Sequence, residues 1–292
     1  MRVLVIGIGG MLGHKLWQVF DSRFDAWGTT LFEFSRLERF GIFSPERTIQ
    51  RVNVTNFDSL TKTFSVVRPD IVVNAVGIIK QVPEAKDPII SLEINSLFPH
   101  RLYHLCQAVG ARLIHMSTDC VFSGNKGMYT EQDQPDASDL YGQSKYLGEL
   151  TQPGSLTVRT SIIGRELSTT NSLIEWFLSQ RGKQIRGFSK ALFTGFPTLV
   201  LAEILADIVE DHPDLTGLYH VSSDAIDKHK LLSLLRDAFE IDIEIEPADE
   251  VQIDRRLDSS KFRQETGFVP LSWPELVQKM ANDPTPYDQW RK

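Results

Sequence analysis

Short apolar runs alternate with stretches of helical spacing through the first half of this chain, and no other feature limits its fold as strongly. Residues 3–6 form a continuous apolar run, as expected for a strand that is covered on both faces. Apolar residues within 12–20 then recur at the spacing of one helix face. Further strands are expected at 26–30, 51–54, 71–76, 113–117 and 156–159. This alternation predicts an α/β fold with a doubly wound parallel sheet that carries helices on both faces.

A glycine-rich turn joins the first expected strand to the first expected helix. Gly7, Gly10 and Gly13 have the spacing G-x-x-G-x-x-G, and Met11 and Leu12 lie between the last two. Glycine permits positive φ and lets a ligand approach the backbone closely. The free N–H groups and the dipole of the following helix attract a pyrophosphate. The strand–turn–helix context therefore predicts a Rossmann-type dinucleotide site at these five residues, and a tight turn without a ligand is the alternative.

The second half of the chain is less regular than the first. We expect residues 1–165 to form the dinucleotide-binding Rossmann domain and 166–292 to form mainly a smaller, substrate-binding C-terminal lobe. Within that lobe, 198–223 contains a helical pattern and one more apolar run, so we expect this segment to return to the Rossmann sheet. No clean linker separates the two parts.

The end of the second expected strand bears on the choice between NAD and NADP. NAD-binding proteins usually carry an acidic residue there, which binds the ribose hydroxyls. In this chain Thr29 and Thr30 stand at that end, and Asp25 lies at the opposite end of the strand. Arg36 and Arg39 follow and could meet a 2′-phosphate, although solvated surface charge is the alternative for both. We expect NADP, or tolerance of NADP and NAD.

Two further strand ends are expected to contact the cofactor. Asn53, followed by Val54, could hydrogen-bond the adenine edge, or could cap a turn instead. Ala75, Val76 and Gly77 end the fourth strand, where a close backbone could lie against the cofactor ribose. Tight packing between strand and helix is compatible with the same residues.

Tyr141 and Lys145 form the candidate reaction centre, together with Thr118. The tyrosine and the lysine are four residues apart, so they share one face of a helix. A free phenol has a pKa of about 10, and a neighbouring ammonium should lower the pKa of Tyr141 towards neutrality. Lys145 could also hold the nicotinamide ribose, and the Thr118 hydroxyl could orient a carbonyl. This arrangement predicts hydride transfer to a carbonyl carbon and proton transfer from Tyr141 to its oxygen.

With these residues in view, the chain resembles an extended short-chain dehydrogenase/reductase, and most of all the dTDP-4-dehydrorhamnose reductase branch. That branch reduces a 4-keto-6-deoxyhexose on a nucleoside diphosphate. The resemblance extends over almost the whole chain and is strongest within 116–149. The matching positions are 117–124, Tyr129, Glu131, Asp133, 141–145, 148–149, 159–161, 195–198 and 257–262.

The resemblance implies roles for individual residues. Thr118, Tyr141 and Lys145 match the hydroxyl, the acid and the lysine of the family's reaction centre. Asn95 matches an asparagine that helps to keep a proton path open, with an ordinary helical polar residue as the alternative. The residues expected at the sugar-nucleotide cleft are Thr118, Asp119, Cys120, Val121, Arg159 and Pro197.

Arg256 is expected to meet the diphosphate of the substrate. It precedes the stretch 257–262, and a guanidinium suits such a group because it can form two parallel hydrogen bonds. A surface salt bridge is the alternative for this residue.

The chain departs from the family pattern at two places. Cys120 stands where the family usually has tyrosine, and we interpret it as a small buried residue without thiol chemistry. The loop after the fourth strand is altered, and its Lys80 could touch the substrate.

Three other functions are possible on the same scaffold. A 4,6-dehydratase usually has two carboxylates immediately after the threonine. Here those two positions are Asp119 and Cys120, so one carboxylate is missing. A 4-epimerase would use the same tyrosine and lysine while keeping NAD bound. The regulatory subunit of methionine adenosyltransferase shares the fold as a non-catalytic binding protein, but the intact Thr118, Tyr141 and Lys145 argue against a purely regulatory role.

Charge and composition exclude other classes of protein. The formal net charge of -7 argues against binding to nucleic acid or to an anionic membrane. Two cysteines suggest no disulfide framework and fit a reducing cytoplasm. No apolar stretch approaches the roughly 20 residues of a membrane span. The seven histidines have no metal-ligand spacing, so we expect no metal.

Together these observations predict a cytoplasmic NAD(P)H-dependent reductase of a nucleoside-diphosphate 4-keto-6-deoxy sugar, which would feed surface polysaccharide synthesis. A homodimer is possible.

Overall fold

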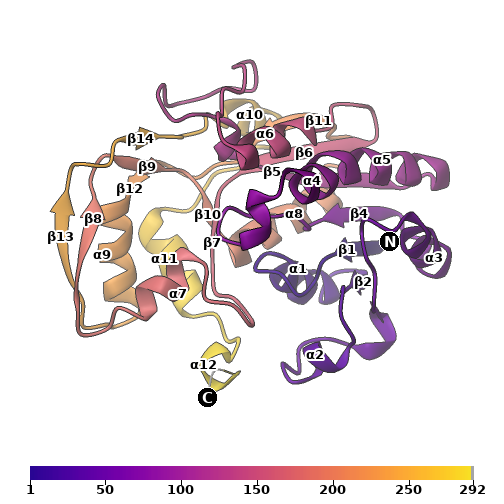
Figure 1. The fold of residues 1–292 in the computed structure, drawn as a ribbon, viewed down its shortest axis with the longest axis horizontal. Helices are drawn as coiled ribbons and strands as arrows, with labels where there is room; N and C mark the ends of the chain where they lie inside the picture. The colour runs from indigo at the N-terminus through magenta and orange to yellow at the C-terminus, as the bar shows by residue number, and fades with distance from the viewer. Residues whose placement is uncertain (291–292) are drawn as a thin grey trace.

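A seven-stranded parallel sheet forms the centre of the protein, which we describe from a computed structural model over residues 1–290 (Figure 1). The strand order is β11-β6-β5-β4-β1-β2-β3. The strands are β1 Arg2–Ile6, β2 Asp25–Thr29, β3 Thr48–Ile49, β4 Ile71–Asn74, β5 Arg112–Thr118, β6 Ser155–Thr160 and β11 Gly217–His220. The order reverses between β1 and β4, and in such sheets ligands bind beyond the carboxyl ends of the strands at this point. The predicted α/β, doubly wound Rossmann-type fold is confirmed.

Helices cover both faces of the sheet. Successive residues of β1 enter two different cores, with Val3 and Val5 in one and Leu4 and Ile6 in the other. This explains why the strand is apolar throughout, because neither face meets water. The helices and short helical turns of the first half are α1 Gly13–Asp21, α2 Ser35–Glu38, η1 Pro45–Arg47, α3 Phe57–Val67, η2 Pro83–Lys86, α4 Pro88–Leu92, η3 Glu93–Leu97, α5 Phe98–Val109, η4 Asp119–Val121 and α6 Leu140–Leu147.

The third strand lies earlier in the chain than the predicted 51–54. Arg51 has a φ of 59°, in the left-handed region, which cannot continue a strand. The pairing with β2 is therefore made by β3, which ends at Ile49. The fourth strand likewise ends at Asn74, before the predicted 76. Sequence patterns place the body of a strand better than its ends.

The predicted helix over 91–109 is interrupted by a wider, π-helical turn, η3. Pro99 has no N–H group and so cannot bond to the carbonyl four residues back, that of Asn95. The freed carbonyl faces Gly148, where a Cβ atom would lie 1.9 Å from the Asn95 oxygen. Turns of this kind often occur at functional sites.

The C-terminal half builds a lobe of small sheets and helices and also returns to the main sheet. Strands β12-β9-β14 form one small sheet, β13 pairs with β8, and β10 pairs with β7. Helix α8 and strand β11 fall within the segment 198–223, and β11 forms the edge of the main sheet next to β6. The remaining elements are β7 Ile162–Ile163, α7 Leu173–Leu178, β8 Gln184–Phe188, β9 Ala191–Phe193, β10 Phe196–Pro197, α8 Thr198–Asp211, β12 Ile226–Asp227, α9 Lys228–Ala238, β13 Glu244–Ala248, β14 Ile253–Asp254, α10 Ser260–Thr266, α11 Trp273–Ala281 and α12 Tyr287–Trp290.

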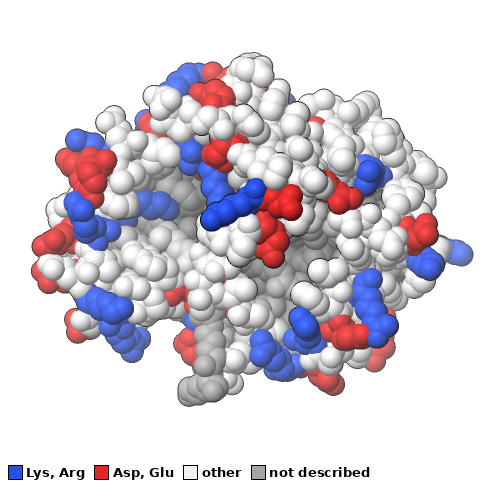
Figure 2. Space-filling view, in the orientation of Figure 1, with Lys and Arg blue, Asp and Glu red and all other residues white. Residues whose placement is uncertain are grey.

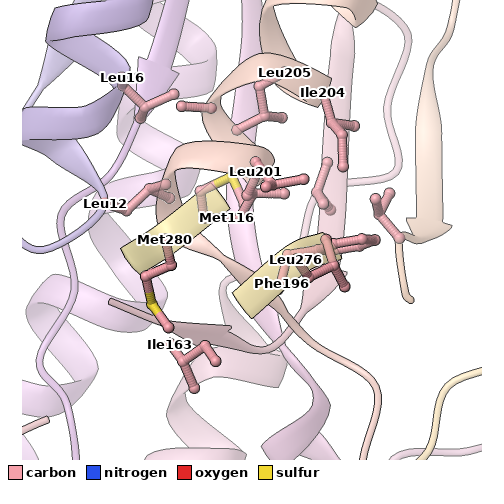
Figure 3. Close-up of a cluster of buried hydrophobic side chains, with 14 of the residues drawn as sticks. Leu12, Leu16, Met116, Ile163, Phe196, Leu201, Ile204, Leu205, Leu276 and Met280 are labelled. Carbon is pink, nitrogen blue, oxygen red and sulfur yellow. The ribbon is translucent and has the colours of Figure 1, made fainter. Parts of the chain in front are cut away.

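One hydrophobic core joins the two halves. Leu16 of α1, Met116 of β5, Leu201 of α8 and Met280 of α11 belong to the same buried cluster, part of which is drawn in Figure 3. The lobes are therefore held together by packing as well as by the chain. Within residues 1–290, no helix is both long and apolar enough to cross a bilayer.

Candidate active site

The glycine turn after β1 has the geometry that a phosphate-binding turn requires. Gly7 has a φ of +92°, and a Cβ atom on Gly13 would lie 2.0 Å from the Gly7 carbonyl oxygen, so both positions need glycine. Gly9 and Gly10 are exposed, and a Cβ atom on either would meet no described protein atom closer than 3.5 Å. The backbone here is open to a ligand at the start of α1, which fits a pyrophosphate.

The side chains around this turn divide into structural and accessible groups. Thr29 is buried, and its hydroxyl accepts a hydrogen bond from the Gly7 N–H (3.1 Å), so it supports the turn. Arg36 is exposed and lies over the Phe32 ring at 4.2 Å. Asn53 is exposed, and its side-chain oxygen accepts from the Thr55 N–H (3.0 Å). Of these three, Arg36 is the exposed cation and can meet an anionic group outside the protein.

Thr118, Tyr141 and Lys145 come together at the carboxyl end of β5. Thr118 ends the strand, and α6 carries the other two. Contact between the Thr118 hydroxyl and the phenol is close enough to affect the pKa of Tyr141. Lys145 is buried, and its ammonium donates to the Met116 carbonyl at 2.6 Å. The structure thus gathers the three residues that the sequence pattern singled out.

The pKa of Tyr141 is raised, opposite to the expected lowering by Lys145. Burial of the phenol is the main cause, and the Thr118 hydroxyl opposes it only in part. Burial also lowers the pKa of Lys145 to about 8. Desolvation disfavours the charged form of both groups, and at Lys145 it outweighs the opposing charge of Glu149. Tyr141 therefore holds its proton at neutral pH, as a proton donor must.

Close backbone packing places α6 beside β5. Asp139 caps the start of α6, and its side chain accepts a hydrogen bond from the Gly142 N–H at 2.9 Å. A Cβ atom on Gly142 would lie 2.3 Å from the Cys120 carbonyl oxygen, so only glycine lets α6 approach η4 this closely. This approach brings Tyr141 next to the end of β5.

Asn95 holds the loop after β4 against α6. Its side-chain oxygen accepts from the Ile78 N–H (2.8 Å), and its amide nitrogen donates to the Ile78 carbonyl (3.0 Å) and to the Ser144 hydroxyl (3.1 Å). Gly77 is exposed and lies beside both Asn95 and Lys145. Asn95 is thus a buried support behind the reaction centre.

An ion pair next to Tyr141 joins the loop after β4 to the start of α6. Lys80 lies 2.8 Å from Asp139 and 5.5 Å from the centre of the Tyr141 ring. Cys120 is half-buried nearby, and burial raises the pKa of its thiol to about 12, which makes it unreactive. The altered loop therefore does face the reaction centre, through Lys80.

Two cations that the sequence analysis missed face the same region. The Arg255 guanidinium donates to the Phe122 carbonyl (2.8 Å) and lies 3.8 Å from the Cys120 sulfur. Lys228 lies over the Phe193 ring at 4.5 Å. Burial raises the pKa of Asp119, and the charges of Arg255 and Lys228 oppose that rise. Both cations are half-buried, and neither has an ion-pair partner within residues 1–290.

Other predicted substrate contacts are engaged inside the protein. Arg159 has 2% side-chain exposure and forms two hydrogen bonds to Glu149, of 2.7 and 2.6 Å. Arg256 is paired with Asp254 at 2.6 Å. Val121 and Pro197 are buried. These placements favour structural roles, and the adjacent Arg255 is the arginine that approaches the reaction centre.

Figure 2 shows that charges of both signs are scattered over the face drawn in Figure 1. No continuous basic patch is visible on that face.

Comparison with known proteins identifies the family. The RmlD substrate binding domain matches residues 1–285. The chain belongs to this family. The resemblance to an extended short-chain dehydrogenase/reductase is thereby confirmed.

Three curated relatives illustrate the range of functions among similar chains. "dTDP-4-dehydrorhamnose reductase" of Escherichia coli (strain K12) is 25% identical, over 97% of this chain and 98% of its own length. "Spore coat polysaccharide biosynthesis protein SpsK" of Bacillus subtilis (strain 168) is 29% identical, over 77% and 74%. "Methionine adenosyltransferase 2 subunit beta" of Mus musculus is 23% identical, over 95% and 89%.

Solved structures share the fold over nearly the whole chain. The dTDP-4-dehydrorhamnose reductase of Bacillus anthracis str. Ames, in complex with NADP, has a TM-score of 0.77 and 21% identity, and covers 96% of this chain and 98% of its own. The UDP-glucose 4-epimerase of Thermus thermophilus, in complex with NAD, has a TM-score of 0.78 and 18% identity, and covers 100% and 99%.

Proposed function

We propose that this protein is an NAD(P)H-dependent sugar-nucleotide reductase, and that it reduces the 4-keto group of a nucleoside-diphosphate 4-keto-6-deoxyhexose. The observation that carries the proposal is the meeting of Thr118, Tyr141 and Lys145 at the end of β5, in a sheet whose first strand leads into an open glycine turn. Membership in the RmlD substrate binding domain family and similarity to dTDP-4-dehydrorhamnose reductases support it.

The residues of the site suit a ketone reduction. A dihydronicotinamide cofactor bound beyond the glycine turn would supply the hydride that such a reduction needs at the carbonyl carbon. Tyr141 donates its phenolic proton to the carbonyl oxygen, so that the ketone becomes an alcohol. The Thr118 hydroxyl orients that oxygen, and Lys145, held by the Met116 carbonyl at 2.6 Å, stabilises the phenolate that forms. The raised pKa of Tyr141 keeps the phenol protonated until the substrate arrives.

The glycine turn is the proposed cofactor site. The backbone of residues 9–12 would hold the pyrophosphate, and the exposed Arg36 would meet the 2′-phosphate of NADP. No acidic residue stands at the end of β2 to bind the ribose of NAD selectively. Both NADP and NAD remain in the proposal, since solved structures of this fold contain either one.

Arg255 and Lys228 would bind the diphosphate of the substrate, in place of the predicted Arg256. Both are half-buried beside Asp119 and Cys120, and both are free of ion pairs within the described chain. Asp119 lies within electrostatic reach of both cations and offers one carboxylate to two positive charges, so an anionic ligand would supply the charge that is missing. A sugar nucleotide brings such an anion next to the carbonyl that is reduced.

The direct test is to incubate the protein with a panel of nucleoside-diphosphate 4-keto-6-deoxy sugars and NADH or NADPH. Oxidation of the cofactor, measured by absorbance, with a 4-hydroxy sugar identified by NMR, is the expected result. If none of the substrates oxidises the cofactor, the reductase proposal fails.

Similarity to methionine adenosyltransferase 2 subunit beta supports a second candidate, a non-catalytic binding subunit. A protein that binds NADPH but reduces no sugar, and that forms a complex with a methionine adenosyltransferase catalytic subunit, would favour it. NAD that stays bound through purification would instead favour a 4-epimerase.

A cytoplasmic location, a homodimer and a place in polysaccharide synthesis remain predictions. The similarity to the spore coat protein supports the last of these.

A further inference from the structure

The last described residues fold back onto the cofactor half of the molecule. We call residues 282–290 the C-terminal strap. In Figure 1 this yellow chain leaves α11 and runs to α12 at the lower edge of the molecule. Tyr287 of the strap is buried, and the Trp290 ring meets the Phe40 ring edge-on at 4.9 Å. Phe40 follows α2, so the strap reaches the part of the chain that lies next to the proposed cofactor site.

A chain of hydrogen bonds connects the strap to the glycine turn. His14, in the first turn of α1, is fully buried. Its Nδ1 atom lies 2.9 Å from the Gly10 carbonyl oxygen, and its Nε2 atom lies 2.6 Å from the Tyr287 hydroxyl. Gly10 belongs to the turn proposed to hold the pyrophosphate. One imidazole thus bridges the turn and the strap.

The direction of these hydrogen bonds follows from the groups present. Burial lowers the pKa of His14 to about 4, so the ring is neutral and carries one N–H. A carbonyl oxygen can only accept, so the N–H must be on Nδ1. Nε2 then accepts, and the Tyr287 hydroxyl donates to it. The Gly10 carbonyl therefore sets the tautomer of His14, and Tyr287, by donating to Nε2, holds the ring in the orientation that aims its N–H at Gly10.

A buried ion pair holds the strap in place one residue further along α1. Lys15 lies 2.5 Å from Asp283, with side-chain exposures of 2% and 8%. The Lys15 ammonium also donates to the Thr285 hydroxyl at 2.7 Å. On the other side, Arg165 connects Asp288 of the strap (2.6 Å) to Glu175 of α7 (2.8 Å). The strap is thus fixed to both halves by ion pairs that do not involve the Tyr287 hydroxyl.

We propose that the C-terminal strap is part of the cofactor site, and that Tyr287 is a positioning residue that acts through His14 on Gly10 and the first turn of α1. The inference rests on the cofactor-binding half of the proposed function and does not depend on which sugar is reduced. Without the phenolic hydroxyl, the His14 ring loses one of the two hydrogen bonds that orient it. The turn that presents N–H groups to the pyrophosphate then becomes less well ordered. Binding of the cofactor would then have to restore that order.

The test compares Tyr287→Phe with Tyr103→Phe. Tyr103 also donates one hydrogen bond to a described group, the Pro153 carbonyl at 3.1 Å, but it lies on α5, away from the glycine turn. Dissociation constants for NADPH and NADH are measured by calorimetry without any sugar nucleotide, and thermal unfolding is measured without cofactor. We expect Tyr287→Phe to weaken cofactor binding about five- to tenfold, as for the loss of one buried hydrogen bond. Tyr103→Phe should leave binding unchanged.

Two further measurements separate positioning from general destabilisation. Amide hydrogen exchange of residues 10–16 should rise in Tyr287→Phe, while exchange in β4 and β5 stays as in the wild type. His14→Gln should weaken cofactor binding by a similar factor, and the double variant should be no weaker than His14→Gln alone, because both residues act along one path.

Unchanged cofactor affinity in Tyr287→Phe would overturn the inference. So would a uniform rise in exchange over the whole protein, or full additivity with His14→Gln. A wild type that binds cofactor but reduces no sugar would contradict the proposed reaction and leave this test intact.

Discussion

At the scale of single residues, burial decides which side chains of the candidate site carry a charge. Burial favours the neutral forms of both Tyr141 and Lys145, so the phenol would be protonated at the start of the proposed reaction. Arg159 is held by Glu149 inside the protein, whereas Arg255 is half-buried and without a carboxylate partner in the described chain. The two arginines have the same side chain and differ in their partners within the folded protein, so the residue type alone could not distinguish their roles.

Tyr141→Phe removes the proposed proton donor and little else. We expect turnover to fall by at least about a hundredfold, as for loss of a general acid, with cofactor affinity nearly unchanged. Steady-state kinetics and calorimetry check the two quantities. Tyr146→Phe, on the same helix but exposed, is the matched control and should keep normal turnover. Near-normal turnover in Tyr141→Phe would remove this residue from its role.

Lys145 makes the stability of the protein depend on pH. Its pKa is lowered from 10.5 to about 8 on folding, so between these values the unfolded chain binds more protons. The unfavourable contribution of Lys145 is therefore complete below about pH 8 and disappears as the pH rises to 10.5. Relative to Lys145→Met, the wild type should gain unfolding free energy over this interval, on the order of a few kcal/mol. Denaturant unfolding at several pH values measures it, and a flat difference would contradict the lowered pKa.

Arg255→Met and Lys228→Met test the proposed diphosphate contacts. Each change should raise the KM for the sugar nucleotide about tenfold or more, since a charge-assisted hydrogen bond is lost. The KM for the cofactor should not change. Arg256→Met is the adjacent control, because Arg256 already pairs with Asp254. Equal effects of Arg255→Met and Arg256→Met would reject the assignment.

At the scale of elements, the site depends on how closely α6 approaches η4 and η3. Gly142 packs against the Cys120 carbonyl and Gly148 against the Asn95 carbonyl. The packing is so close that a Cβ atom at either position would clash with the carbonyl oxygen. Arg159 then connects β6 to Glu149, just beyond the end of α6, and to His220 of β11 at 3.2 Å. Backbone packing and one buried ion pair together fix the helix that carries Tyr141.

Arg159→Met should therefore destabilise the protein rather than weaken substrate binding directly. It leaves the Glu149 carboxylate buried without its partner, which costs about 3–5 kcal/mol. Denaturant unfolding measures the loss, and Arg159→Met with Glu149→Gln should recover part of it. A large rise in the KM for the sugar nucleotide with unchanged stability would instead support the substrate contact that the family resemblance implied.

At the scale of the whole molecule, the two halves share one core. From the second half, strand β11 forms one edge of the main sheet and helix α8 packs into the shared core, and the strap contacts α1. The candidate site draws on both halves, with Tyr141 from one and Arg255 and Lys228 from the other. A ligand at the site therefore touches parts of the chain that lie far apart in the sequence.

The shared core predicts cooperative unfolding. The full chain should show one thermal transition, with equal calorimetric and van't Hoff enthalpies. The fragment 1–165 should not fold stably, because it lacks the α8 and β11 surfaces that cover β6 and the face of α1. Calorimetry and near-UV circular dichroism check both statements. A fragment with a cooperative transition of its own would show that 1–165 is an independent domain.

Most elements of the main sheet could be predicted from the sequence, because burial on both faces enriches the strands in apolar residues, which form continuous runs in β1 and β4. The exception was β3, which has two residues and is too short to show such a pattern. The left-handed backbone at Arg51 has no signal in an arginine, and the wide turn η3 follows from a proline whose effect depends on its neighbours.

Sequence alone determined the doubly wound fold and the glycine turn and singled out the three residues of the proposed reaction centre, because these depend on local patterns of apolar residues, glycines and helical spacing. Tertiary structure decided which arginine is buried and which is free, which groups lose their charge, and that the C-terminal strap lies on α1. These properties depend on residues far apart in the chain, since burial and ion pairing exist only once the sheet and both lobes have packed together.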